Sequence, residues 1–105
     1  MVDKLADELA RGRAAQATGN AGRARVCARR AAGLAIKAWY QARLGGQWGG
    51  DAMTQLKRLQ AEALAPEPVR AAAARLTTKV DFDHALPFTN DPLTDAELLI
   101  AYVQG

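Results

Sequence analysis

The feature that most constrains this fold is a run of alanines between residues 21 and 42. The alanines are separated by alternating steps of three and four residues, and no proline interrupts the run. This spacing keeps a row of side chains on one face of an α-helix, where the row meets a neighbouring helix. Because each side chain is a single methyl group, two helix backbones can approach closely along the row. We name this row the alanine seam: Ala21, Ala24, Ala28, Ala31, Ala35, Ala38 and Ala42.

The helix that carries the alanine seam has clear ends in the sequence. The side chain of Asn20 can accept an amide hydrogen bond at the start of a helix. The glycine-rich segment Gly45-Gly46-Gln47-Trp48-Gly49-Gly50 favours a break after Leu44. We therefore predict a helix over residues 21–44, about 36 Å long at the standard rise per residue, as the centre of the domain.

Two further helices are predicted on either side of this one. The first spans residues 2–17 and ends at Thr18-Gly19-Asn20. The other follows Asp51, which has the chemistry of an N-cap, and stops before Pro66.

The C-terminal third of the chain predicts two more helices. One spans residues 67–80, with prolines where a first turn tolerates them. A loop over residues 81–92 follows, and Thr94-x-x-Glu97 predicts a capping box that opens a last short helix. No segment indicates a strand. We expect an all-α fold, an up-down bundle of four to five helices with a long second helix, in a single domain of residues 1–105.

The composition excludes several classes of protein. The chain has 105 residues, a net charge of +3 and one cysteine, Cys27. A single cysteine excludes an internal disulfide and a cysteine zinc site. No stretch reaches the roughly 20 apolar residues that a membrane span needs, and the first residues lack the pattern of a signal peptide. We therefore expect a cytoplasmic protein with no membrane contact.

Two rows of basic residues lie on the predicted long helix, with Val26, Gly33, Tyr40 and Leu44 between them. Such a face can contact phosphates, acidic side chains of a partner or a second copy of the chain. Alternatively, the arginine stems cover the edges of the core and the charges pair with Asp3, Asp7 and Glu8 of the first helix. The first row is Arg23, Arg30 and Lys37, and the second row is Arg25, Arg29 and Arg43.

No arrangement of residues in the sequence indicates catalysis, a cofactor or a metal. The glycine-rich segment lacks the Lys-Ser/Thr ending of a phosphate loop. Its Trp48 either pins the segment to the bundle or stands exposed as an anchor for a partner. His84 lies among acids without any regular ligand spacing, which indicates a loop, and Cys27 is expected to be an inert thiol at the edge of the core.

Residues 18–33, with the sequence TGNAGRARVCARRAAG, resemble the second-helix region of small prokaryotic proteins related to the HEPN family, and the likeness extends over residues 18–45. The resemblance implies a helical bundle that forms a homodimer. It also implies contact with RNA or nucleotides, because many members resemble metal-independent ribonucleases with an arginine, four to six intervening residues and a histidine. This chain departs from that pattern, since eight residues separate Arg75 from His84, its only histidine.

We therefore predict a non-enzymatic helical interaction module of HEPN-like type, with no cofactor, that forms a homodimer or binds another protein. The alternative is an RNA-binding or RNA-cleaving domain whose arginines contact phosphates. The predicted partner or RNA contacts are Arg23, Arg25, Arg29, Arg30, Lys37, Tyr40 and Trp48.

Overall fold

The structure, a computed structural model, describes residues 3–79 and 86–105 and contains five α-helices in these ranges, with no strand among them. The predicted all-α fold with a long second helix is confirmed. Within the described ranges, none of the helices combines the length and apolar character needed to cross a membrane. The helices are α1 (Lys4–Ala17), α2 (Ala21–Leu44), α3 (Ala52–Gln60), α4 (Glu67–Thr77) and α5 (Pro92–Gln104).

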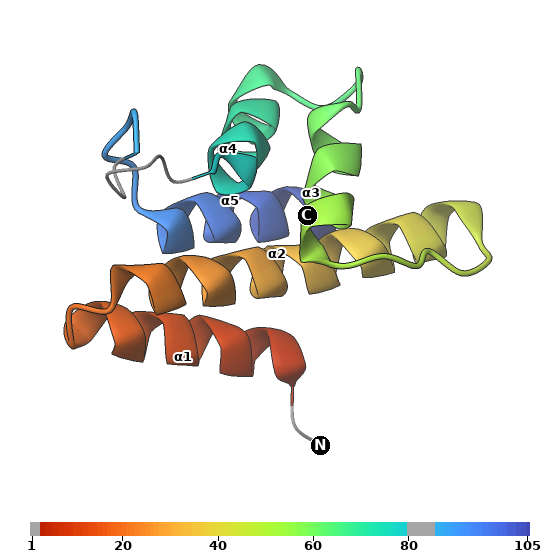
Figure 1. Cartoon of the computed structure of the whole chain (residues 1–105). Helices are drawn as coiled ribbons and strands as arrows, with labels where there is room; N and C mark the ends of the chain where they lie inside the picture. Colours follow the sequence, from red (N-terminus) through yellow and green to blue (C-terminus); the bar gives the residue numbers. More distant parts are fainter. Residues whose placement is uncertain (1–2, 80–85) are drawn as a thin grey trace.

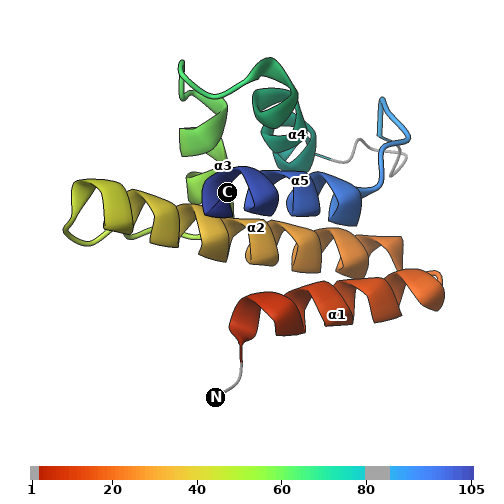
Figure 2. The ribbon, with the colours of Figure 1, turned by 180° about the vertical axis from the view of Figure 1, so that it is seen from behind.

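The helix α2 is the middle layer of the fold. α1 packs along one side of it and α5 along another, as Figures 1 and 2 show from two directions. α1 runs antiparallel to α2, whereas α5 runs in the same direction as α2 (Figure 1). α3 stands across α2, and α4 connects α3 to α5. The order therefore differs from a regular up-down bundle, because α3 crosses the long helix instead of following it.

The alanine seam is buried along the middle of α2. Ala24, Ala28, Ala31 and Ala35 are at most 4% exposed, whereas Ala21, Ala38 and Ala42 are exposed at the two ends of the helix. The alanine seam therefore packs against neighbouring helices where they cover α2, and it is exposed to solvent where they do not. The bulk of the core comes from Ile36 of α2 itself and from leucines that the other helices bring to this surface: Leu56, Leu59, Leu76, Leu93 and Leu99.

At two glycines a neighbouring helix lies too close to leave room for a Cβ atom. A Cβ atom added at Gly12 of α1 would lie 2.6 Å from the Leu93 side chain of α5 and 3.2 Å from Cβ of Cys27. A Cβ atom added at Gly33 of α2 would lie 2.8 Å from the backbone Cα of Ala52, the first residue of α3. Gly33 is therefore covered by α3 and is not a flat patch on the surface, contrary to its expected place on the basic face.

The contact at Gly33 predicts a difference between two substitutions in the same helix. Gly33→Ala should lower the free energy of unfolding by about 1–3 kcal/mol, because the new methyl group forces the backbone of α3 outward. Gly22→Ala should raise it by about 0.5–1 kcal/mol, since the space at Gly22 is open and alanine favours a helix. Urea denaturation measures both values. Equal stabilisation by the two substitutions would show that α3 does not pack on Gly33.

The start of α5 corrects the predicted capping box. The N-cap is Asp91, whose carboxylate accepts the amide hydrogen of Leu93 at 3.0 Å. Thr94 lies inside the helix and donates its hydroxyl to Asp91, while Glu97 forms an ion pair with Arg13 of α1. The prediction was wrong because Pro92 fits the first helical position, which moves the cap upstream of Thr94.

Three other helix ends differ from their predicted positions. α1 begins at Lys4 with Asp3 as its N-cap. α3 ends at Gln60, since the following residues form turns closed by hydrogen bonds from Glu62 to Leu59 and from Ala65 to Glu62. α4 ends at Thr77, and Val80, the predicted last residue, lies outside the described residues.

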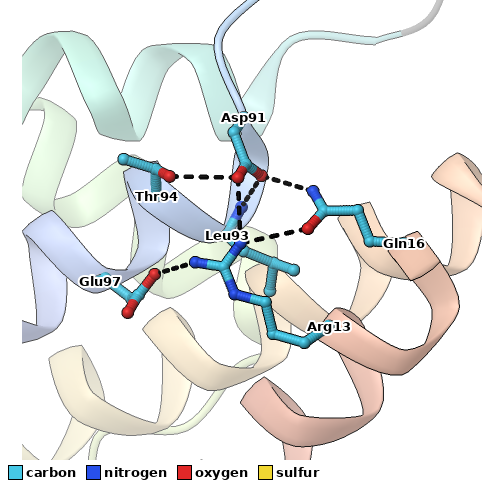
Figure 3. Close-up of polar contacts among 6 residues, drawn as sticks. All are labelled: Arg13, Gln16, Asp91, Leu93, Thr94 and Glu97. Atoms are coloured by element: carbon cyan, nitrogen blue, oxygen red, sulfur yellow. Dashed lines mark hydrogen bonds and ion pairs between the residues drawn. The ribbon is translucent and has the colours of Figure 1, made fainter.

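The carboxylate of Asp91 also joins α1 to α5 (Figure 3). Its Oδ1 accepts from Gln16 at 2.7 Å, and its Oδ2 accepts from Arg13 at 3.0 Å. Partial burial by itself raises the pKa of Asp91, but the hydrogen bonds from Gln16, Leu93, Arg13 and Thr94 outweigh it and lower the pKa overall. The ionised form of Asp91 is therefore the form that the folded state favours.

This lowered pKa predicts how pH changes the effect of a substitution. At pH 7, Asp91→Ala should lower the free energy of unfolding by about 1 kcal/mol, as for loss of an N-cap. A carboxyl with a depressed folded pKa contributes stability above its unfolded value, about 3.9, and loses it as the pH falls through the folded value. The difference between wild type and variant should therefore shrink below about pH 4. Denaturation curves with an equal difference at pH 7 and pH 3 would contradict this role.

Candidate functional site

The structure divides the seven predicted contact residues into two groups. One group makes contacts inside the fold, and the other extends from the surface of α2. The inner group is Arg25, Arg29, Tyr40 and Trp48, and the outer group, which we name the outer row, is Arg23, Arg30 and Lys37.

Arg25 and Arg29 close the C-terminal end of α4. Arg25 is only 5% exposed, and its guanidinium donates to the carbonyl oxygens of Arg75 and Thr78. Arg29 donates through Nε to the carbonyl oxygen of Leu76 at 2.6 Å. The last carbonyls of a helix lack partners within the helix and carry partial negative charge, so a buried cation is stabilised there.

Burial disfavours the charged form of both arginine side chains. It lowers the pKa of Arg25, which the nearby charge of Arg29 lowers further, and it also lowers the pKa of Arg29. The predicted pairing with acids of α1 is corrected by the structure, because these two side chains meet backbone carbonyls of α4 instead. Both have a structural role in the fold, and they do not extend the exposed basic face of α2.

This placement predicts that substitution of an inner arginine lowers the free energy of unfolding much more than substitution of an outer one. Arg29→Ala should lower the free energy of unfolding by about 1.5–3 kcal/mol, because carbonyl groups at the end of α4 lose a charged donor. Arg23→Ala should change it by less than about 0.5 kcal/mol, since its side chain lies on the surface. Guanidinium denaturation of the two variants makes the comparison. A larger loss for Arg23→Ala would contradict the assignment of inner and outer arginines.

Tyr40 and Trp48 hold the glycine-rich segment against the bundle. The Tyr40 ring is buried and stacks on the Trp48 ring with 5.0 Å between centroids. The indole of Trp48 donates to the carbonyl oxygen of Gly45 at 3.0 Å, and the guanidinium of Arg58 lies 5.1 Å from the Trp48 ring. Of the two alternatives for Trp48, the contacts favour the one in which it pins the segment. Tyr40 is therefore covered and not open to a partner.

Gln55 also contributes to this region, and the sequence did not single it out. It is buried on α3, and its amide Nε2 lies 3.2–3.4 Å from the carbonyl oxygens of Trp48, Gly49 and Gly50. Its Oε1 accepts from Arg58 at 2.9 Å. The sequence shows only that Gln55 is a polar residue next to Leu56 on the apolar side of a helix. This position does not reveal which groups the Gln55 amide binds.

The outer row points away from the core. Arg23 and Arg30 are exposed and Lys37 is partly exposed. Their side chains form no hydrogen bond or ion pair with residues 3–79 or 86–105. The expected acidic partner Asp7 pairs with Arg11 of its own helix at 3.0 Å, and Asp3 caps α1. The outer row therefore keeps its charges toward solvent within the described part of the chain.

A groove of about 470 Å³ lies over part of the outer row, and we name it the α2 groove. α1 and α3 both pack on α2 but do not contact each other, so they leave a strip of α2 open between them. The floor consists of Arg30, Gly33, Leu34 and Lys37. One wall comes from the first turns of α1 and the other from residues 50–55. These two segments are far apart in the chain, so the groove could not be predicted from the sequence.

Two of the three acids that line the α2 groove are bound by groups of their own chain, whereas its three bases are not bound by any described residue. Asp7 pairs with Arg11, and Asp51 accepts from the amide and the hydroxyl of Thr54 at 2.9 Å each. These hydrogen bonds lower the pKa of Asp51. Glu8, the third acid, also lines the groove, and one of its carboxylate oxygens is buried without a hydrogen-bond partner among the described residues. Lys4, Arg30 and Lys37 therefore equal the acids of the groove in number, and Arg23 of the outer row adds a further cation on the same face of α2.

The described residues contain few groups suited to chemistry. Cys27 is buried, and burial together with the nearby Glu8 carboxylate raises the pKa of its thiol, which makes it a poor nucleophile. Across residues 3–79 and 86–105, no group of three or more His, Cys, Asp and Glu side chains is placed to hold a metal ion. His84 lies outside the described residues.

The chain matches no protein-family model, no curated protein and no solved structure in the three comparisons made with known proteins. The resemblance to the HEPN family therefore remains a prediction from residues 18–45.

Proposed function

We propose that this chain is a non-enzymatic helical interaction module that forms a homodimer through the exposed end of α2. The observation that carries the proposal is that α2 extends past α1 and α5 (Figure 1) and that small and apolar side chains are exposed on this extension. We name this exposed end of the helix the α2 tip; it carries Ala38 and Ala42 of the alanine seam and, on another side of the helix, Leu44.

The α2 tip continues the alanine seam beyond the helices that cover it. Ala38 and Ala42 are exposed, and Leu44 is 65% exposed at the last position of the helix. The same spacing that permits close approach inside the bundle would permit it to a second copy of α2. A two-fold arrangement brings the same patch of both copies together, so one surface is sufficient for a closed dimer.

Neighbouring contacts support a rigid α2 tip. The guanidinium of Arg43 lies 4.4 Å from the ring of Trp39, which in turn lies 5.8 Å from the ring of Tyr102 on α5. The loop after the tip is fixed by the stacking of Trp48 on Tyr40. An ordered surface loses less conformational entropy on association, which favours binding.

The homodimer predicts a particle of twice the chain mass of 11.2 kDa. Ala42→Glu combined with Leu44→Glu should give monomers, because two charges would be buried without partners in the contact. Light scattering coupled to gel filtration at micromolar concentration measures the mass. Leu64→Glu is a matched control, since Leu64 is 84% exposed but lies between α3 and α4, away from the tip.

Two results would reject the dimer proposal. One is a wild-type chain that stays monomeric at micromolar concentration. The other is a dimer that the double variant leaves intact, which would place the contact elsewhere on the molecule.

RNA binding is the second candidate function, supported by the outer row alone. Because Arg25 and Arg29 are bound to α4, only Arg23, Arg30 and Lys37 of the predicted basic residues remain toward solvent. Three cations on one helix predict weak binding that falls steeply with salt. Binding of single-stranded RNA at low salt, with loss in Arg23→Glu/Arg30→Glu, is the expected sign of this function, and absence of binding would reject it.

A further inference from the structure

We propose that the α2 groove binds an acidic amphipathic helix of a partner protein. This surface is separate from the α2 tip, so the inference goes beyond the dimer. Its groups are Lys4, Arg30 and Lys37 as cations, Leu34 as an apolar contact, and Arg23 and Val26 as the continuation of the same face of α2.

The groove and the outer row together carry more cations than acids. Lys4, Arg23, Arg30 and Lys37 form no ion pair with the described residues, whereas Asp7 is paired with Arg11, so that four cations face the two remaining carboxylates of the groove, Glu8 and Asp51. A negatively charged partner would therefore gain attraction without breaking an existing contact. Such complementarity speeds association and selects against basic partners.

The outer row repeats with the period of a helix face. Arg23, Arg30 and Lys37 are spaced by seven residues, which corresponds to about 10.5 Å along the axis. Between them, Val26 and Leu34 are 39% and 38% exposed. A helix with an acid at every seventh position and apolar residues between the acids would match both the charges and the apolar side chains.

The shape of the fold favours a helix as the occupant. α1 and α3 pack on α2 at separate places and have no contact with each other, which leaves an open strip of α2 bordered on both sides. An amphipathic helix binds in such a groove through apolar anchors. Here Leu34 lies on the floor with Arg30 and Lys37, and Lys4 lies on the wall. Nucleic acid would use the cations but would leave Leu34 and Val26 without an apolar partner.

The partner must come from another protein. No two acidic residues of this chain stand seven positions apart, so none of its own helices presents acids with the period of the outer row. The α2 tip is accordingly assigned to self-association, and the α2 groove to a different protein.

The test uses a fluorescent synthetic peptide with glutamate at every seventh position and leucine between the glutamates, titrated with the full chain. We expect saturable binding that weakens as salt increases. Arg30→Glu/Lys37→Glu should weaken binding at least about tenfold, since attraction is replaced by repulsion. Lys4→Glu, on the opposite wall, should weaken it independently.

A matched control separates the groove from net charge. Arg70→Glu/Lys79→Glu changes the net charge equally, but these residues lie on and just after α4, on the other side of α2 from α1 (Figure 2). This control and the tip variant Leu44→Glu should bind the peptide as the wild type does.

Three outcomes would overturn the proposal. The first is a wild-type chain that does not bind the peptide, and the second is an equal loss of binding in the control. The third is binding of single-stranded RNA, but not of the peptide, that Arg30→Glu/Lys37→Glu abolishes. Circular dichroism of each variant establishes that the helices are intact.

Discussion

Close approach of helices to α2 is the constraint on which the rest of this structure depends. α1, α3 and α5 all pack on that one helix, and they do so where it carries alanine or glycine. At Gly33 the distance to Ala52 leaves no room for even a methyl group. Small side chains bury little area each, so stability depends on backbones that lie close enough for many dispersion contacts. The α2 groove follows from the same packing, because α1 and α3 dock at separate places and leave a strip between them.

The parts of the fold that local chemistry decides could be predicted from the sequence. Asn20 and the glycines after Leu44 determine the ends of α2, and both ends lie where they were predicted. The start of α5 was missed, because Asp91 and Thr94 are both good N-caps and the proline between them decides which one is used. The crossing of α3 over α2 depends on a contact between residues far apart in the chain, which no local pattern reveals.

The contacts of the candidate site were harder to predict from the sequence than the fold was. Arg25 and Arg30 look alike in the sequence, yet one is buried at the end of α4 and the other is exposed. What separates them is the position of carbonyl groups about fifty residues later in the chain, and these become neighbours only when α4 packs. The inner arginines serve the fold through backbone carbonyls and not through the expected acids of α1, whereas the outer row remains toward solvent. Proposed binding by this protein depends on that division.

The most direct test of this division is the solvent exchange of arginine side-chain protons, measured by nuclear magnetic resonance. We expect slow exchange for the Nε proton of Arg29, which is bound to the carbonyl oxygen of Leu76, and fast exchange for those of Arg23 and Arg30. A protected Arg30 together with a rapidly exchanging Arg29 would contradict this division. In that case the outer row would belong to the fold, and the α2 groove would lose the charges proposed to bind a partner.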